Sequence, residues 1–226
     1  MTLTRTALLR HFQLHRPAPY HAESLQRLSS LPSHSLREAA VLIGFVERPS
    51  GLHILFTRRS PHLRHHPGQI SFPGGKKETE DSSLAAAALR ETDEEIGISP
   101  QQIEVFGSLP PLPTISRFAV TPILAFIDPD YSLQIEPNEV DEVFEVPADF
   151  ILNPQNLFSQ RFLFRTHLHR IFAIPYQRHF IWGVTAQIIQ AMQTQLIGIQ
   201  KSKHRKNRNE GRNRNKDRKS LPSFDK

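Results

Sequence analysis

Residues 54–98 read ILFTRRSPHLRHHPGQISFPGGKKETEDSSLAAAALRETDEEIGI and carry the strongest structural signals in the chain. The last part predicts a helix within residues 82–97, because the alanine run 85–88 has the highest helix propensity. Asp81 or Ser82 is expected to cap its amino end, and Gly97 suits the left-handed position that ends a helix. The residues expected to form a buried face recur at three- and four-residue steps: Ala85, Ala88, Leu89, Thr92 and Ile96.

Three acidic residues, Glu91, Glu94 and Glu95, lie on an adjacent side of this helix. They repel one another and sit at the negative end of the helix dipole, each effect costing some tenths of a kcal/mol up to about 1 kcal/mol. One interpretation is an ordinary solvated acidic face. The other is a metal site, because hard divalent cations prefer carboxylate oxygens and would offset the repulsion.

The residues before the helix favour the metal site. Phe72–Gly75 (FPGG) predicts a turn whose two glycines let the backbone come close to a ligand. Together with Arg90–Ile98 it resembles the Nudix box, G-x5-E-x7-R-E-U-x-E-E-x-G-U, where U is aliphatic. The sequence departs from this pattern in two ways. Asp81 replaces the first Glu, with eight residues before Arg90, and Thr92 replaces the aliphatic residue.

The segment upstream narrows the resemblance. Residues 55–75 are similar to L-L-T-x-R-[SA]-x3-R-x3-G-x3-F-P-G-G, the signature of the coenzyme A pyrophosphatase branch of the Nudix hydrolases, with Phe56 the one departure. Roughly nine specified positions agree outside the box, which makes a chance match improbable. The resemblance implies an α/β fold, a Nudix-type α/β/α sandwich with a mixed β-sheet. It also implies Mg²⁺- or Mn²⁺-dependent hydrolysis of the pyrophosphate of a nucleoside diphosphate derivative.

The implied substrate is coenzyme A or acyl-coenzyme A, which would give 4′-phosphopantetheine and adenosine 3′,5′-bisphosphate. By resemblance, Glu91 and Glu95 are the principal metal ligands, and Glu94 is a further ligand or the base that activates water. Arg90 would orient these carboxylates. Another nucleotide, such as ADP-ribose or a nucleoside triphosphate, is the alternative substrate.

Four residues ahead of the helix are expected to contact the substrate or the site. Gly74 and Gly75 would hold their loop against the metal site. Arg59 and Arg64 are predicted phosphate contacts, because a guanidinium matches the geometry of phosphate oxygens.

Two further groups have competing interpretations. His62, His65 and His66 are either ligands for a borderline metal such as zinc or solvent-facing loop residues. Glu139 or Glu142, in the acidic run 136–145, is either an additional ligand or general base, or part of a solvated face.

The remaining sequence predicts a sheet and two further helices. Strands are expected at 39–46 and 52–57, forming a hairpin, at 103–107 and 119–127, and in a late hairpin at 162–164 and 170–174. The proline-rich segment 109–114 is expected to be a loop. Helices are predicted around residues 6–14 and from Trp182 onward, the second with Val184, Ile188 and Met192 in the core.

Composition bounds the domain organisation and the compartment. The predicted units are an amino-terminal segment (1–36) that packs on the domain, a hydrolase domain (37–200) and a tail (201–226). The chain has no cysteine, no long apolar run and no signal-peptide pattern, so we expect a cytoplasmic enzyme with a small-molecule substrate and no membrane partner. The oligomeric state is left open.

The tail carries the basic charge of the chain. Residues 201–226 contain eleven Lys and Arg against three Asp and Glu, whereas the other 200 residues carry a net charge of −2. The tail is predicted to be disordered, because it has too few apolar residues to offset its ordering entropy. It is either a nucleic-acid contact, through counterion release from phosphates, or a solubilising extension.

Overall fold

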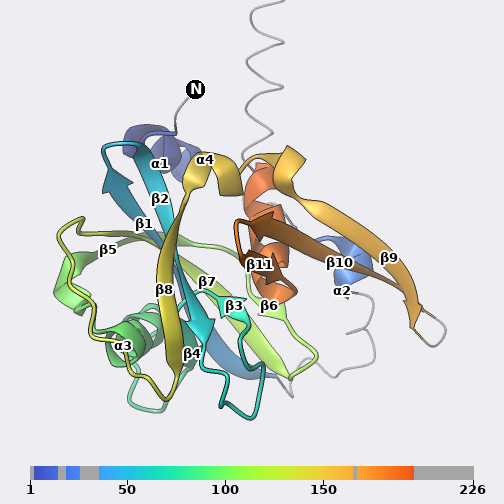
Figure 1. The fold of residues 1–226 in the computed structure, drawn as a ribbon, viewed down its shortest axis with the longest axis horizontal. Helices are drawn as coiled ribbons and strands as arrows, with labels where there is room; N and C mark the ends of the chain where they lie inside the picture. Colours follow the sequence, from blue (N-terminus) through green and yellow to red (C-terminus); the bar gives the residue numbers. More distant parts are fainter. Residues whose placement is uncertain (1–2, 15–18, 26–35, 165–166, 196–226) are drawn as a thin grey trace, which may run out of the picture.

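A computed structural model describes residues 3–14, 19–25, 36–164 and 167–195 of the 226-residue chain. Its central strand, β1 (Arg37–Arg48), pairs antiparallel with β2 (Gly51–Arg59) and parallel with β7 (Phe118–Ile127). The sheet is therefore mixed, as predicted (Figure 1). The turn at residues 48–51 confirms the first hairpin, with Arg48 opposite Gly51.

Short strands extend this sheet on both sides. They are β3 (Ile70–Ser71), β4 (Gly74–Lys76), β5 (Ile103–Ser108), β6 (Leu112–Pro113) and β8 (Val140–Pro147). The strand order is β3-β2-β1-β7-β5, while β4 pairs with β1, β6 with β7 and β8 with β2. The helices with defined bounds are α1 (Arg5–Leu14), α2 (Ala22–Leu25), α3 (Leu84–Ile96) and α4 (Ala148–Ile151), with 3-10 turns at Pro100–Gln102 and Pro154–Asn156.

A second, three-stranded sheet projects from the first (Figure 1). It consists of β9 (Phe158–Phe164), β10 (His167–Tyr176) and β11 (His179–Trp182), ordered β11-β10-β9. β9 and β10 form the late hairpin that the sequence predicts. Residues 184–195 then form the predicted final helix, and no helix in the described ranges is long and apolar enough to cross a membrane.

The two faces of β1 belong to two hydrophobic clusters, because side chains alternate along a strand. Ala40, Leu42 and Val46 pack in the cluster that contains α3. Ile43 and Phe45 pack in the cluster with Leu8 of α1 and several residues of the 184–195 helix. Helices therefore cover both faces of the sheet, which confirms the predicted α/β/α sandwich.

Helix α3 matches the prediction with one correction at its cap. Ser83, rather than Asp81 or Ser82, accepts a hydrogen bond from the Ala86 N–H at 3.0 Å. Asp81 is instead bound to the Glu78 N–H and to a side chain of α3. Gly97 ends the helix with φ 75°. The buried residues are Ala87, Ala88, Thr92, Glu95 and Ile96, so the expected Ala85 and Leu89 are only half-buried.

Three segments differ from the sequence-based expectation. Gly74 and Gly75 lie in strand β4 rather than in a turn, because they pair with Val41 and Ala40 of β1. Within the acidic run, residues 140–145 belong to strand β8, whose apolar Val140 and Val146 are buried in the two different hydrophobic clusters. The proline-rich loop includes the two-residue strand β6.

Two predicted units lie partly or wholly outside the described residues. The tail 201–226 is outside them, as is most of the segment 26–36 that would join the amino-terminal segment to the domain. Leu8 and Tyr20, from the described part of residues 1–36, are buried in the core.

Candidate active site

The buried carboxylate of Glu95 lies between α3 and strand β4. Its side chain faces the sheet and is 4% exposed. The Gly74 backbone N–H donates a hydrogen bond to Glu95 Oε2 at 3.1 Å. Burial raises the pKa of Glu95 to about 8, against the lowering effects of the Gly74 N–H and of Arg59. A carboxyl group so strongly desolvated needs a cation to ionise fully near neutral pH.

Gly75 leaves the space in which the carboxylate of Glu91 sits. A Cβ atom at position 75 would lie 2.5 Å from Glu91 Cδ and equally close to Oε2, nearer than any such contact allows. Burial raises the pKa of Glu91, an effect that its hydrogen bond from Arg90 opposes. The glycine pair of FPGG therefore adjoins both acids from a strand rather than from a turn: Gly74 bonds Glu95 through its N–H, and Gly75 leaves room for Glu91 because it has no side chain.

Arg90 connects the acids of the site. Its Nη1 donates to Glu94 Oε2 at 2.7 Å, and its Nη2 donates to Glu91 Oε1 at 3.0 Å and to the Lys76 carbonyl at 3.1 Å. Asp81 binds the same guanidinium through both oxygens, Nε to Oδ1 at 3.0 Å and Nη2 to Oδ2 at 3.1 Å. A fork of this kind fixes the direction of an arginine side chain. The Asp81 that departs from the box pattern therefore anchors Arg90.

Replacing Asp81 by Asn is expected to lower kcat/KM about tenfold without removing any proposed metal ligand. The guanidinium of Arg90 lowers the pKa of Asp81, so the native pair is ionised and bidentate. The neutral amide cannot accept both bonds, which frees Arg90 to turn away from Glu91, and lost orienting partners typically cost about 10- to 100-fold. Steady-state kinetics would test this, with the exposed Asp130→Asn as control. An unchanged kcat/KM would show that Asp81 does not act through Arg90.

Of the two further acids, Glu139 lies near the site and Glu142 does not. The negative charge of Glu139 contributes to raising the pKa of both Glu91 and Glu95. Its loop is tied to the end of α3, because the Gln134 N–H donates to the Ile96 carbonyl at 2.9 Å and the Glu136 N–H to that of Glu95 at 2.9 Å.

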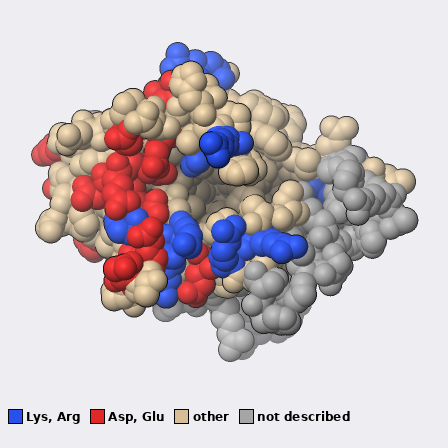
Figure 2. Space-filling view, turned by 90° about the horizontal axis from the view of Figure 1, so that it is seen from below, with Lys and Arg blue, Asp and Glu red and all other residues tan. Residues whose placement is uncertain are grey.

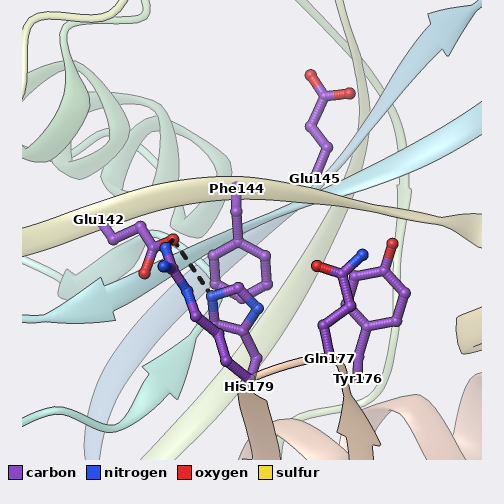
Figure 3. Close-up of a pocket in the computed structure, with 7 residues that line it drawn as sticks. Glu142, Phe144, Glu145, Tyr176, Gln177 and His179 are labelled. Carbon is purple, nitrogen blue, oxygen red and sulfur yellow. Dashed lines mark hydrogen bonds and ion pairs between the residues drawn. The ribbon is translucent and has the colours of Figure 1, made fainter.

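Glu142 belongs to a different pocket. It pairs with Arg58 at 3.1 Å and with His179 Nε2 at 3.3 Å, and Arg178 approaches the same carboxylate. The His179 ring stacks on Phe144, with centroids 3.7 Å apart (Figure 3). The carboxylate of Glu142 is therefore held by Arg58, Arg178 and His179, away from the acids of α3.

The acids fit a divalent cation by the chemistry of their donors. Glu94 is 59% exposed and turned toward Arg90, and within the described ranges no three His, Cys, Asp or Glu side chains converge as a closed set of ligands. Mg²⁺ does not require such a set, because it keeps several waters and takes one or two protein carboxylates. Glu91 and Glu95 supply two carboxylates whose ionisation a cation would favour.

The predicted phosphate contacts fall in different places. Arg59 is close enough to Glu95 to lower its pKa, and it forms no ion pair within the described part of the chain. Arg64 is exposed in the loop after β2 and does not line the cavity described below. Of the loop histidines, His62 and His65 are exposed, whereas His66 lines the cavity.

A cavity of about 370 Å³ opens beside these residues. Arg59, Gly74 and Gly75 form part of its wall, and its other walls come from residues 113–120 and 182–188. Figure 2 shows acidic and basic side chains adjacent to each other beside a hollow on this face. The prediction of Val184, Ile188 and Met192 in the core is confirmed, because Ile188 and Met192 are buried there and Val184 packs against that core. Val184 and Ile188 also line this cavity, which their helical spacing does not predict.

Comparison with known proteins gives the family. A family model described as the NUDIX domain matches residues 36–165. The proteins named "Uncharacterized Nudix hydrolase NudL" from Enterobacter sp. (strain 638) and Salmonella newport (strain SL254) are each 40% identical over 195 residues, covering 86% of this chain and 95% of the relative.

Among solved structures, the Nudix hydrolase RenU of M. smegmatis has a TM-score of 0.44 at 22% identity, covering 50% of this chain and 71% of its own. The NUDIX domain of Shewanella oneidensis NrtR, complexed with ADP ribose, has a TM-score of 0.41 at 22% identity, covering 56% and 84%. The family match over 36–165 includes β4, α3 and every acid of the site. The chain therefore belongs to the Nudix family of hydrolases.

Proposed function

We propose that this chain hydrolyses the pyrophosphate bond of coenzyme A or an acyl-coenzyme A, giving 4′-phosphopantetheine and adenosine 3′,5′-bisphosphate. The buried Glu95 carboxylate, held by the Gly74 N–H beside Glu91, is the observation that carries the hydrolytic part of this proposal. The signature at residues 55–75, similar to that of the coenzyme A pyrophosphatase branch, supports the substrate.

Glu91 and Glu95 would hold Mg²⁺ or Mn²⁺, with Glu94 and Glu139 as further acids within the site. When bound, such a cation neutralises the diphosphate and lowers the pKa of a coordinated water. Glu94, exposed and held by Arg90, and Glu139, close to both buried acids, are the two candidates for taking the proton of the attacking water.

The other residues bind and orient. Arg90 keeps Glu91 and Glu94 directed into the site while Asp81 holds Arg90 in place. Arg59 lines the cavity next to Gly74 and is the proposed contact for a phosphate oxygen. Arg64, which occupies the second arginine position of the upstream signature, is a second proposed phosphate contact. The absence of cysteine suits the cytoplasmic location that we propose.

The metal-free protein is expected to lose stability as pH rises, because of Glu95. Its folded-state pKa of about 8 lies above the ordinary value of 4.5, so the folded state binds the extra proton. The stabilisation is complete below pH 4.5 and is lost between pH 4.5 and about 8, amounting to as much as roughly 5 kcal/mol. Glu95→Gln, neutral at every pH, should be the more stable protein at pH 8.

Urea unfolding in EDTA at pH 5 and pH 8 measures this effect. The difference in free energy of unfolding between Glu95→Gln and the parent should grow with pH, and added Mg²⁺ should stabilise the parent alone at pH 8. A difference that does not change with pH would show that Glu95 ionises normally in the folded protein.

A substrate panel tests the proposed function. Coenzyme A, ADP-ribose and a nucleoside triphosphate would each be incubated with the purified protein and Mg²⁺ or Mn²⁺, and the products separated by chromatography. We expect preferential release of 4′-phosphopantetheine and adenosine 3′,5′-bisphosphate. A preference for ADP-ribose or the triphosphate would overturn the substrate and leave the metal site in place.

The basic tail supports a separate proposal, contact with nucleic acid, and it lies outside the described residues. Deleting residues 201–226 should abolish any salt-sensitive binding to nucleic acid and leave hydrolysis intact. Binding that survives the deletion would rule out the tail as the contact.

A further inference from the structure

The lining of the cavity beside the acids combines basic and apolar side chains. Its positively charged lining residues are Arg59, at the end of β2, and Lys76, in β4, and no carboxylate belongs to its lining. The rest of the lining is mainly apolar, contributed by side chains such as Val41, Phe72, Phe118, Val120, Val184 and Ile188. A ligand that fits this distribution has an anionic group joined to an uncharged, largely apolar group.

Several buried polar residues lie among the apolar side chains of the lining, and Gln187 is the one of these described residues that has an unpaired donor. Gln187 lines the cavity and is 4% exposed, and its Nε2 atom has no hydrogen-bond partner among the described residues. Two other buried polar residues of the same helix are bonded: Thr185 Oγ1 donates to the Ile70 carbonyl at 3.0 Å, and Gln193 Nε2 donates to that of Ile151 at 2.7 Å. A buried donor without a partner costs free energy, so its retention at a cavity wall points to a bound ligand.

We propose that Gln187 recognises the uncharged end of the diphosphate substrate, with its side-chain amide N–H donating to an acceptor on that end. This rests on the function proposed above. Two uncharged parts of coenzyme A offer such an acceptor: a ring nitrogen of the base and an amide carbonyl of the pantetheine arm. Trp182, 41% exposed, and Ile115, 66% exposed, also line the cavity and offer apolar surface to either group.

Gln187 would then determine which substrate binds, and it would take no part in the hydrolytic step. The helix that carries it, residues 184–195, lies beyond the matched NUDIX domain at 36–165. The hydrolytic acids and the recognition of the uncharged end therefore come from separate parts of the chain. Selectivity should change with Gln187 while the metal-dependent step does not.

Measuring the binding of each half of coenzyme A separately shows whether Gln187 bonds the base or the pantetheine arm. Binding of 4′-phosphopantetheine and of adenosine 3′,5′-bisphosphate to the full chain with Mg²⁺ would be measured by calorimetry, for the parent and for Gln187→Met. Met keeps a similar volume and removes the amide. We expect the affinity for one half to fall about three- to tenfold and that for the other to stay the same, since a single hydrogen bond is lost. The affected half identifies the group in the cavity.

Two comparisons separate recognition from a structural role. Gln190→Met makes the same change on the same helix at a residue that bonds Thr194 and does not line the cavity, and it should leave both affinities unchanged. The melting temperature of ligand-free Gln187→Met should equal or exceed that of the parent, because an unpaired buried donor has been removed. Gln187→Glu, which replaces the donor by an acceptor, should weaken the same half.

The result that overturns the proposal is equal affinity of parent and Gln187→Met for both halves, or no binding of either half to the parent. A fall in melting temperature without a fall in affinity would also overturn it, since it would assign Gln187 to folding. Binding of the halves does not depend on hydrolysis, so a protein that binds them through Gln187 yet cleaves no coenzyme A would contradict only the proposed function.

Discussion

Replacing Glu95 by Gln is expected to lower kcat/KM by at least about 100-fold, the largest effect of any single side chain in the site. Residues that merely orient metal ligands cost about 10- to 100-fold when they are removed, and Glu95 is a proposed ligand. Gln has nearly the same shape and can still occupy the buried position below the Gly74 N–H. The loss would therefore come from the missing charge.

Asp93→Asn is the matched control for this prediction. Asp93 is on the same helix, two residues away, and its side chain is exposed. Both variants remove one acidic charge from α3, so a general electrostatic effect would appear in both. Steady-state hydrolysis at saturating Mg²⁺ should show parent-like activity for Asp93→Asn, and comparable losses in the two variants would contradict a specific role for Glu95.

Replacing Gly75 by Ala is expected to lower kcat/KM by about 10- to 100-fold through the displacement of Glu91. The added Cβ would lie 2.5 Å from the Glu91 carboxyl carbon, so this side chain has to leave its present position. Glu91 can turn toward solvent because it is only half-buried, and the cost to folding is therefore small compared with the cost to activity. Kinetics and thermal unfolding of the variant would measure both quantities.

Two other glycines make this prediction specific. At Gly107 a Cβ would meet only Leu124 Cδ1 at 3.8 Å, an ordinary contact, so Gly107→Ala should leave activity unchanged. At Gly74, with φ 140°, it would lie 2.3 Å from the Ala40 backbone oxygen, so Gly74→Ala should destabilise the whole fold. If Gly75→Ala instead lost stability as Gly74→Ala does, with activity per folded molecule preserved, the proposed displacement of Glu91 would be wrong.

Sequence alone was sufficient for the parts of the fold that local chemistry determines. The alanine run and Gly97 predicted α3, because helix propensity and the end of a helix depend on neighbouring residues. The first hairpin and the strands at 103–107 and 119–127 followed from short apolar runs between turn residues. The cap moved to Ser83 because Asp81 has a stronger partner in Arg90, a contact between residues nine apart.

Long-range pairing accounts for what the sequence did not predict. Gly74 and Gly75 have turn propensity, yet they form a strand because residues 39–41 of β1, beyond the part paired with β2, are available to pair with them. From sequence, the acidic run 136–145 is either a solvated face or the source of a ligand or general base. In the fold, acids of this run have ion-pair partners on β1 and β2: Glu145 pairs with Arg48 and Glu142 with Arg58. Two placements depend on how distant segments pack: Glu139 lies close enough to raise the pKa of Glu95, and Gln187 lies in the cavity wall. Residue spacing along the chain predicts neither.

Direct binding of Mn²⁺ to the metal-free protein is the measurement that tests the central claim, that the acids of α3 form a divalent-metal site. Electron paramagnetic resonance would report free Mn²⁺ during titration of the parent, Glu95→Gln and Asp93→Asn. The account predicts bound Mn²⁺ for the parent and for Asp93→Asn, and at least about tenfold weaker binding for Glu95→Gln. Parent-like binding by Glu95→Gln, or no binding by the parent, would contradict it.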